Sequence, residues 1–167
     1  MGKAVVLYNS RGGNTTKVAA KIAEGLDSEC FDHKHIPDLQ VYDLVVVGSW
    51  VMMGRISFAG ARYLKKLSRK HILGKKIALF FTSGAPETIN PMTENKNPRL
   101  IKDIMFDSME TILCKNATVT IVPDRFYAKG ATRMFKRGKP NEPLGHPSEE
   151  ELQQAKTFGE SLKQQFL

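Results

Sequence analysis

The fold is decided by the stretch KAVVLYNSRGGNTTKVAAKIAEGL, residues 3–26. Ala4 to Tyr8 is an almost unbroken apolar run, typical of a strand buried on both faces of a parallel sheet. A polar turn with adjacent glycines follows at residues 10–15. Beyond it, apolar residues recur at helical spacing: Val18, Ala19, Ile22, Ala23 and Leu26. Because the free N–H groups and the dipole of a helix N-terminus point into such a turn, the sequence predicts a phosphate site there.

Several kinds of phosphate site are excluded by their motifs. No Gly-Lys pair is followed by Ser or Thr, so the nucleoside-triphosphate loop is absent. Gly12 and Gly13 are adjacent and no third glycine follows, so the dinucleotide fingerprint is absent too. Ile36 and Thr120 stand where a cysteine phosphatase would carry its Arg, and Asn9 stands where a receiver domain would carry its Asp. What remains is a non-hydrolytic cradle of hydroxyls and amides.

Length and composition indicate one domain over residues 1–167. No apolar run approaches the length of a membrane span, and two cysteines without motif spacing indicate neither a disulfide framework nor a zinc site, so a cytoplasmic protein is expected. His33 and His35 are interpreted as surface histidines, and no metal site is expected. The net charge of +8 is compatible with an acidic partner, an anionic membrane surface or nucleic acid. Nucleic acid is disfavoured, because the basic residues do not interleave with stacking aromatics as in known modules.

The turn Ser10–Thr15, reading SRGGNT, resembles the flavodoxin signature Thr/Ser-x-Thr-Gly-Asn-Thr, which holds the phosphate of flavin mononucleotide (FMN). Gly12 replaces the usual hydroxyl, and Arg11 is a candidate for a charged contact in its place. The run DLVVVGSW at residues 43–50 also resembles flavodoxins, in which the loop that follows covers one face of the isoalloxazine ring. Trp50 falls where that family often places a stacking aromatic; the alternative is that it fills the core under the loop.

A third loop completes the resemblance, because it follows the apolar run at residues 76–82 and corresponds to the second flavin-binding loop of the family. Many flavodoxins carry a Tyr here that stacks on the outer face of the flavin. No Tyr lies between Gly84 and Lys115. The outer face is therefore expected to be open, or to be covered by Ile89 or Met92.

The three loops are expected to converge, because in an open parallel sheet ligands bind outside the carboxyl ends of the strands, beside the switch in strand order. The loops span residues 10–15, 49–54 and 82–92. The expected cofactor-binding residues are Ser10, Arg11, Gly12, Gly13, Asn14, Thr15, Ser49, Trp50, Val51, Met52, Met53, Gly54, Thr82, Ser83, Gly84 and Ala85. No side chain stands out as an acid or a base, so no catalytic residue is expected.

The alternation of strand-like and helix-like stretches predicts an α/β fold, a three-layer flavodoxin-like sandwich. Its parallel sheet is expected to have five strands in the order 2-1-3-4-5, with helices on both faces. A short second strand is expected near Cys30 at the sheet edge, and a helix is expected to begin at Asn97-Pro98. The last strand is expected at residues 117–122, and Ser148 to Glu151 is expected to cap the final helix.

Two basic stretches of the sequence are considered as contact surfaces for a partner molecule. Residues 123–147 are expected to form a long basic loop, and a redox partner is a candidate to dock at residues 125–139. A second set of basic residues falls on one face of a helix, where a solvated surface is the plain interpretation. Its members are Arg62, Lys65, Lys66, Arg69 and Lys70.

The resemblance implies an FMN-binding protein that passes electrons to or from a partner protein or a small-molecule acceptor. An enzyme of the same fold remains an alternative, namely an FMN-dependent NAD(P)H/quinone oxidoreductase or an oxidoreductase of the protoporphyrinogen type. Another alternative, from a different class, is a flavin-free basic module that binds anionic partners. The sequence leaves the choice between carrier and enzyme open.

Overall fold

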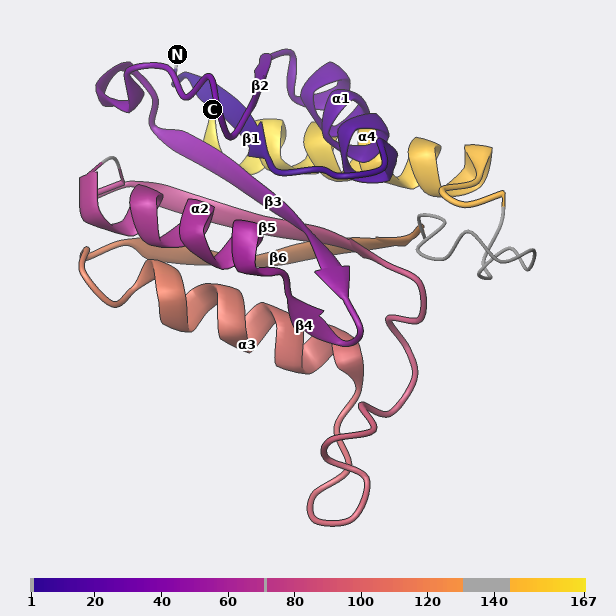
Figure 1. The fold of residues 1–167 in the computed structure, drawn as a ribbon. Helices are drawn as coiled ribbons and strands as arrows, with labels where there is room; N and C mark the ends of the chain where they lie inside the picture. The colour runs from indigo at the N-terminus through magenta and orange to yellow at the C-terminus, as the bar shows by residue number, and fades with distance from the viewer. Residues whose placement is uncertain (1, 71, 131–144) are drawn as a thin grey trace.

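The computed structural model describes residues 2–70, 72–130 and 145–167. Its main sheet is parallel, with the strand order β2-β1-β3-β5-β6 (Figure 1). These strands are β1 (Ala4–Tyr8), β2 (Glu29–Asp32), β3 (Leu44–Met52), β5 (Lys76–Ser83) and β6 (Thr120–Lys129). The expected five-stranded order is confirmed, since β5 and β6 are the fourth and fifth strands of that expectation. An additional two-residue strand, β4 (Arg55–Ile56), pairs antiparallel with the end of β3.

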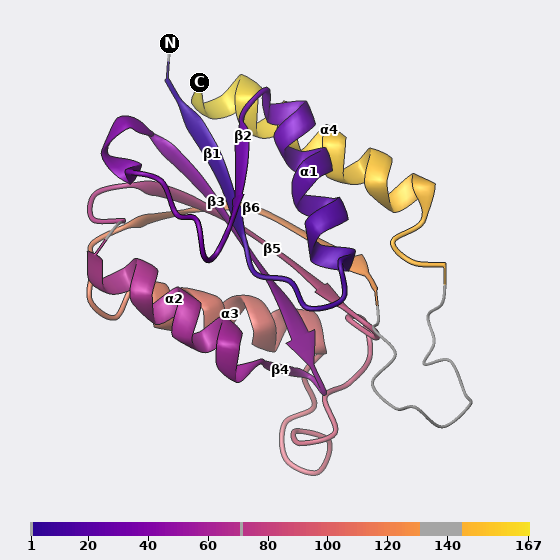
Figure 2. The same ribbon diagram turned by 45° about the horizontal axis from the view of Figure 1, so that its top comes forward.

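Helices cover both faces of the sheet, as a three-layer sandwich requires. The helices are α1 (Asn14–Leu26), α2 (Phe58–Lys70), α3 (Ile101–Leu113) and α4 (Glu149–Phe166). α1 and α4 lie on one face, and α2 and α3 lie on the other (Figures 1 and 2). A short 3₁₀ helix, Leu39–Val41, leads into β3. None of the helices in the described ranges combines the length and the apolar composition that a membrane crossing needs.

The apolar runs of the central strands are explained by this layering. Val5 and Leu7 of β1 belong to the core under α2 and α3, while Val6 belongs to the core under α1 and α4. Because successive side chains of a strand point to opposite faces, a strand covered on both faces must be apolar at every position. This is why the first strand could be recognised from five residues.

Two glycines allow α1 and α4 to pack closely. A Cβ on Gly159 of α4 would lie 2.2 Å from the carbonyl oxygen of Ile22, and one on Gly25 of α1 would lie 2.0 Å from that of Lys156. Ion pairs surround this contact, since Lys156 Nζ lies 2.8 Å from Glu24 and Lys163 Nζ lies 3.2 Å from Asp27. The small residues therefore set the distance between the two helices.

We expect Gly159→Ala to destabilise the protein, because the new methyl group must push the backbone of α1 away. The expected loss is about 2 kcal/mol in the free energy of unfolding, typical of an overpacked core. Urea denaturation followed by circular dichroism measures it. Gln164→Ala, an exposed position of the same helix, is the control and should change the stability by less than about 0.5 kcal/mol. Equal stability of the two variants would show that the helices are not held this closely.

The third helix begins later than Asn97-Pro98 predicts. α3 starts at Ile101, and Leu100 before it has an extended backbone. The backbone N–H of Asn90 donates to Arg99 O at 2.8 Å, and that of Ile101 donates to Thr88 O at 2.9 Å. This short antiparallel bridge holds the chain extended beyond the proline, so the expectation of a cap at Asn97 is wrong.

The last strand is longer than expected and passes through Pro123. Ile77 pairs with Ile121 but Leu79 pairs with Arg125, so β6 bulges between these two pairs. A bulge leaves residues out of the ladder, which is how a strand accommodates a proline. The expectation of a loop is therefore wrong for residues 123–129. The remaining basic residues of the expected docking loop, Arg133, Lys136, Arg137 and Lys139, lie outside the described residues.

The capping of the final helix is confirmed. The Ser148 side chain accepts a hydrogen bond from the backbone N–H of Glu151 at 3.2 Å. The Glu151 carboxylate in turn accepts from the backbone N–H of Ser148 at 2.8 Å. The same carboxylate accepts from the backbone N–H of Lys129 at 2.8 Å, so the cap also ties α4 to the end of β6.

Candidate functional site

The turn between β1 and α1 is shaped by a glycine. Gly13 has φ +90° and ψ −10°, a left-handed conformation that residues with a side chain rarely adopt. Its backbone N–H donates to the Ser10 hydroxyl oxygen at 3.1 Å, which closes the turn. As the N-cap of α1, Gly13 offers no side chain to the free N–H groups of the first helical turn. These donors are left to an anion from outside the chain.

Two threonines join this turn to the neighbouring strand. Thr15 Oγ1 and Thr82 Oγ1 lie 2.7 Å apart, and the two residues are only 1% and 2% exposed. A single hydrogen bond between two hydroxyls uses one of their two protons, so the second proton can be donated to a ligand. This hydrogen bond thus joins the carboxyl end of β5 to the start of α1.

Trp50 lies near the end of β3 and is half-buried. The guanidinium carbon of Arg11 lies 6.0 Å from the centre of its ring. A cation at this distance is attracted by the ring face. The indole therefore lies beside the Ser10–Thr15 turn, rather than deep in either core cluster.

A two-residue hairpin turn follows Trp50. Met52 pairs with Arg55, so the turn consists of Met53 and Gly54. Both have positive φ, 51° and 74°, as the twist of a tight hairpin requires. For a methionine this conformation costs about 1–2 kcal/mol, and strain of this kind clusters at ligand sites. The Met53 side chain is 81% exposed.

The long loop between β5 and α3 is tied to this hairpin. The buried Asn90 donates through its side-chain amide to Gly54 O at 3.0 Å. Arg55 contacts the sulfur of Met92 through Nε at 3.0 Å and Nη2 at 2.6 Å. The hairpin and the loop therefore form one continuous wall.

The expectation of a loop at residues 49–54 is wrong, because residues 49–52 continue β3 and only residues 53–54 form a turn. The Ser10–Thr15 turn, the β3–β4 hairpin and the long loop after β5 enclose a cavity of about 1010 Å³ at the carboxyl ends of β1, β3 and β5. The expected residues that line it are Ser10, Arg11, Gly12, Asn14, Thr15, Trp50, Val51, Met52, Met53, Gly54, Thr82, Ser83, Gly84 and Ala85. Two expected residues do not line it. Gly13 gives the turn its backbone conformation without lining the cavity. Ser49 is fully buried against Gly60 of α2.

Sequence reasoning missed several lining residues, which are Arg55, Ile56, Phe58, Ile101 and Gly130, and it did not single out Thr88 and Pro91 within the expected loop at residues 82–92. Ile89 and Met92, the two expected candidates for covering the outer face, line the cavity and are 48% and 64% exposed. The β3–β4 hairpin positions Arg55 and Ile56 at the cavity, together with Phe58, which begins α2 just after it. The one available signal was the glycine at the second position of a two-residue turn, which is typical of a hairpin.

A separate polar network anchors the base of the long loop. Tyr127 Oη donates to Glu87 at 2.6 Å, and Lys102 Nζ donates to Tyr127 Oη at 3.3 Å. The hydrogen bond from Tyr127 and the charge of Lys102 lower the pKa of the Glu87 carboxyl. Glu87 and Tyr127 also line a separate, smaller hollow of about 330 Å³ along β6. No group of three His, Cys, Asp or Glu side chains suited to a metal ion occurs in the described part of the chain.

Comparisons with known proteins agree with this geometry. A family model described as a flavodoxin domain matches residues 5–160. An uncharacterized protein of Methanocaldococcus jannaschii is 28% identical over 163 residues, which cover 96% of this chain and 97% of that protein. The flavodoxin-like domain-containing protein BilS of Clostridioides difficile is 37% identical over 92 residues, 51% of this chain and 49% of BilS. The structure of oxidised flavodoxin 1 from Bacillus cereus is similar, with a TM-score of 0.64 at 17% identity and 99% of each chain covered.

Proposed function

The chain belongs to the flavodoxin domain family, and on that premise we propose that it binds FMN and passes electrons between partners. When bound, the flavin supplies the redox chemistry, and the protein supplies binding, orientation and electrostatics. The observation that carries this proposal is the cavity at the carboxyl ends of β1, β3 and β5. Its lining includes the anion donors of the Ser10–Thr15 turn and the indole ring of Trp50 beside that turn.

The phosphate end of the cavity suits a phosphate monoester. The free N–H groups at the start of α1 and the spare proton of the Thr15–Thr82 pair are donors, and Arg11 adds a positive charge. Ser10 accepts from Gly13 and keeps its own proton for a ligand. Gly12 contributes no hydroxyl, so Arg11 stands in for the donor that most flavodoxins have at this position.

The ring end of the cavity suits a flat aromatic system. Trp50 offers one ring face, and a stacked pair of flat rings buries much area with little loss of rotamer freedom. Met52 and Met53 add polarizable side chains that adapt to the shape of a ligand. These side chains orient the ring and exclude water from one of its faces.

The reducing compartment expected from the sequence is also part of the proposal. Both cysteines are free, and burial raises the pKa of the Cys30 thiol to about 11. A thiol with so high a pKa reacts slowly, which suits a structural role. Two free cysteines are compatible with a reducing compartment, and we propose the cytoplasm.

A second candidate is an FMN-dependent reductase of quinones or similar flat compounds, with NAD(P)H as the reductant. The open outer side of the cavity favours it, because Ile89 and Met92 cover that side only partly. A small planar substrate would have access there. Steady-state oxidation of NAD(P)H by the FMN-loaded protein, with and without a quinone, distinguishes this enzyme from a carrier.

A stepwise reductive titration of the FMN-loaded protein tests the proposed function. A carrier that handles electrons one at a time should develop a new long-wavelength absorption band at half reduction. Direct bleaching to the reduced spectrum would favour the reductase. Failure to retain FMN on a desalting column would contradict both.

The net charge of +8 leads to a prediction about the redox potential. Reduction of the flavin adds negative charge, which a basic protein stabilises and an acidic one opposes. We expect the last reduction step to have a midpoint potential higher than that of an acidic flavodoxin measured under the same conditions. The expected difference is on the order of 60 mV, a tenfold change in the equilibrium constant of a one-electron step, and it should shrink in high salt. An equal or lower potential would contradict the prediction.

A further inference from the structure

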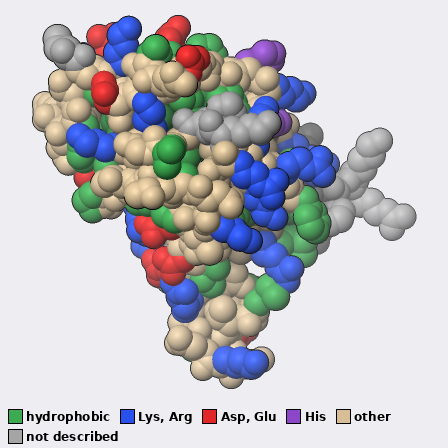
Figure 3. All heavy atoms as spheres, turned by 90° about the vertical axis from the view of Figure 1, so that its left-hand side faces the viewer, with side chains coloured by type: hydrophobic (Ala, Val, Ile, Leu, Met, Phe, Trp, Pro, Cys, Tyr) green, Lys and Arg blue, Asp and Glu red, His purple; other side chains and the backbone are tan. Residues whose placement is uncertain are grey.

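One exposed face of α2 is basic along its whole length. Arg62, Lys65, Lys66 and Arg69 are all exposed, and we call them the α2 strip. At 100° per residue these four positions and Phe58 fall within one narrow arc of the helix. Figure 3 shows Lys and Arg side chains gathered on the right of the face that it draws, where α2 lies. The arc from Phe58 to Arg69 is about 17 Å long, the size of one small contact patch.

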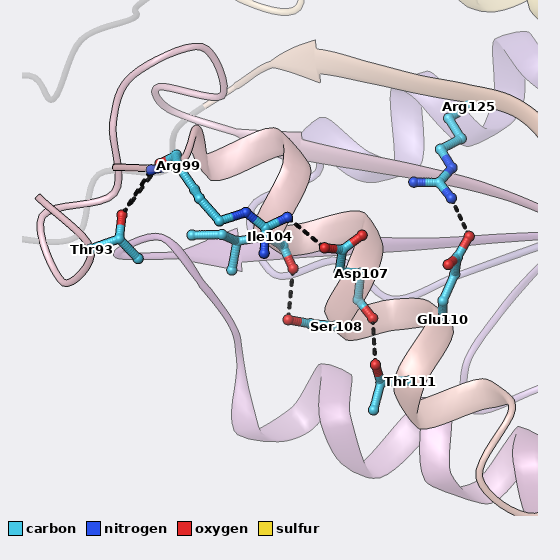
Figure 4. A network of polar contacts seen from close by, with 8 residues as sticks. All are labelled: Thr93, Arg99, Ile104, Asp107, Ser108, Glu110, Thr111 and Arg125. Carbon is cyan, nitrogen blue, oxygen red and sulfur yellow. Dashed lines mark hydrogen bonds and ion pairs between the residues drawn. The ribbon is translucent and has the colours of Figure 1, made fainter. Parts of the chain in front are cut away.

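The α2 strip is not neutralised by its surroundings. α2 contains no acidic residue, and none of the four side chains forms an ion pair or a side-chain hydrogen bond with another described residue. Some basic residues elsewhere are paired. Figure 4 shows that Arg99 and Arg125 each meet an α3 carboxylate, Asp107 at 2.5 Å and Glu110 respectively. Four exposed basic side chains without an ion pair to any described residue are available for contact with an acidic partner outside the chain.

The strip ends at the mouth of the cavity. Phe58, one helical turn before the strip, is 91% exposed and lines the cavity. Met53 of the hairpin lines the cavity as well and is also exposed. Large exposed apolar side chains beside arginines are typical of protein–protein interfaces. The strip therefore continues an apolar patch that borders the proposed flavin site.

We propose that the α2 strip, together with Phe58 and Met53, is the docking surface for a small acidic one-electron carrier protein. This inference rests on the proposed function, because it makes the surface the route by which electrons reach the cavity. Charge complementarity would attract the partner to the α2 strip, and the partner would then make apolar contacts with Phe58 and Met53 at the mouth of the cavity. Flavodoxins are typically acidic, so this arrangement reverses the usual distribution of charge between carrier and partner.

Two other anionic partners fit the surface less well. A membrane-binding helix needs an apolar face free to enter the lipid, but Tyr63, Leu64 and Leu67 of α2 are buried in the core. Single-stranded nucleic acid needs aromatic side chains for its bases to stack on, and no aromatic side chain lies among the exposed residues between Arg62 and Arg69. An acidic protein needs only charge along the strip and apolar contact at its end.

The proposal is tested by calorimetric titration with a small acidic [4Fe–4S] ferredoxin. The variant is Lys65→Gln/Lys66→Gln, which lowers the net charge by two. Its matched control is Gln153→Glu/Gln164→Glu, which makes the same change of net charge at exposed positions of α4, on the other face of the sheet. At low ionic strength the variant should bind the ferredoxin roughly tenfold more weakly than the wild type, and the control within about twofold. At about 0.3 M salt the difference should largely disappear.

FMN retention is measured separately on the same proteins, so a failure of docking can be told from a failure of FMN binding. In the FMN-loaded proteins, reduction by reduced ferredoxin should slow by the same factor in the variant. Equal weakening in variant and control, or no binding of the ferredoxin to the wild type, would overturn the proposal. So would strip-dependent binding of a DNA duplex or of anionic lipid vesicles in place of the ferredoxin.

Discussion

Asn14→Asp should lower the affinity for FMN by about a hundredfold without harming the fold. Asn14 is the first residue of α1 and lines the cavity at the proposed phosphate site. A carboxylate there would face the phosphate at close range. Two like charges a few ångströms apart near a protein surface repel each other by about 3 kcal/mol, which corresponds to a factor of about a hundred in affinity.

The same substitution should leave the stability unchanged or slightly higher, because an acidic residue in the first turn of a helix interacts favourably with the helix dipole. Loss of FMN binding would then be separated from loss of structure. The measurement is FMN titration by calorimetry, together with thermal unfolding of the FMN-free protein.

Thr16→Asp is the matched control for Asn14→Asp. It adds the same charge in the same helical turn, but Thr16 is exposed and does not line the cavity. It should weaken FMN binding by less than about fivefold, since exposed charges are screened. Riboflavin, which lacks the phosphate, should bind the wild type and Asn14→Asp alike. Equal FMN affinity of Asn14→Asp and the wild type would place the phosphate elsewhere.

Trp50→Ala should weaken FMN binding by roughly fiftyfold. The ring of Trp50 is proposed to lie against the flavin, and truncation of a buried aromatic contact in a binding site typically costs 2 kcal/mol or more. Flavin fluorescence gives an independent readout, because a stacked indole quenches it. Flavin emission should therefore be low in the wild-type complex and should recover in Trp50→Ala.

Trp50→Phe is the control, since it keeps a flat ring on the same strand. It should keep most of the affinity, within about tenfold of the wild type. The competing interpretation is that Trp50 only fills space under the loop. Under that interpretation, Trp50→Ala would lower the stability and leave the affinity of the folded protein for FMN unchanged.

The buried strands and the glycine turn at residues 10–15 could be predicted because their signals are local, whereas the strand order was expected from the topology rule and the resemblance. A strand covered on both faces must be apolar throughout, so residues 4–8 and 44–48 stand out. The turn at residues 10–15 has Gly13 where the chain adopts positive φ, a conformation that favours glycine. No distant contact is required for either inference.

The features that were missed depend on contacts between distant segments. α3 begins late because residues 88–90 hold residues 99–101 extended, which overrides the helix-starting signal at Pro98. β6 continues past Pro123 because it bulges there and then pairs with β5 again. Phe58 reaches the cavity only through the hairpin before it. Local propensity cannot show such arrangements.

The most direct test of the central claim, that residues 10–15 hold the phosphate of FMN, is a titration of the flavin-free protein with FMN and with riboflavin. The chain has a single Trp, so its emission reports on Trp50 alone. We expect FMN to quench that emission in a saturable manner with one site per chain, and riboflavin to do so with at least about tenfold lower affinity. Equal affinities for the two flavins, or no quenching by either, would contradict the account.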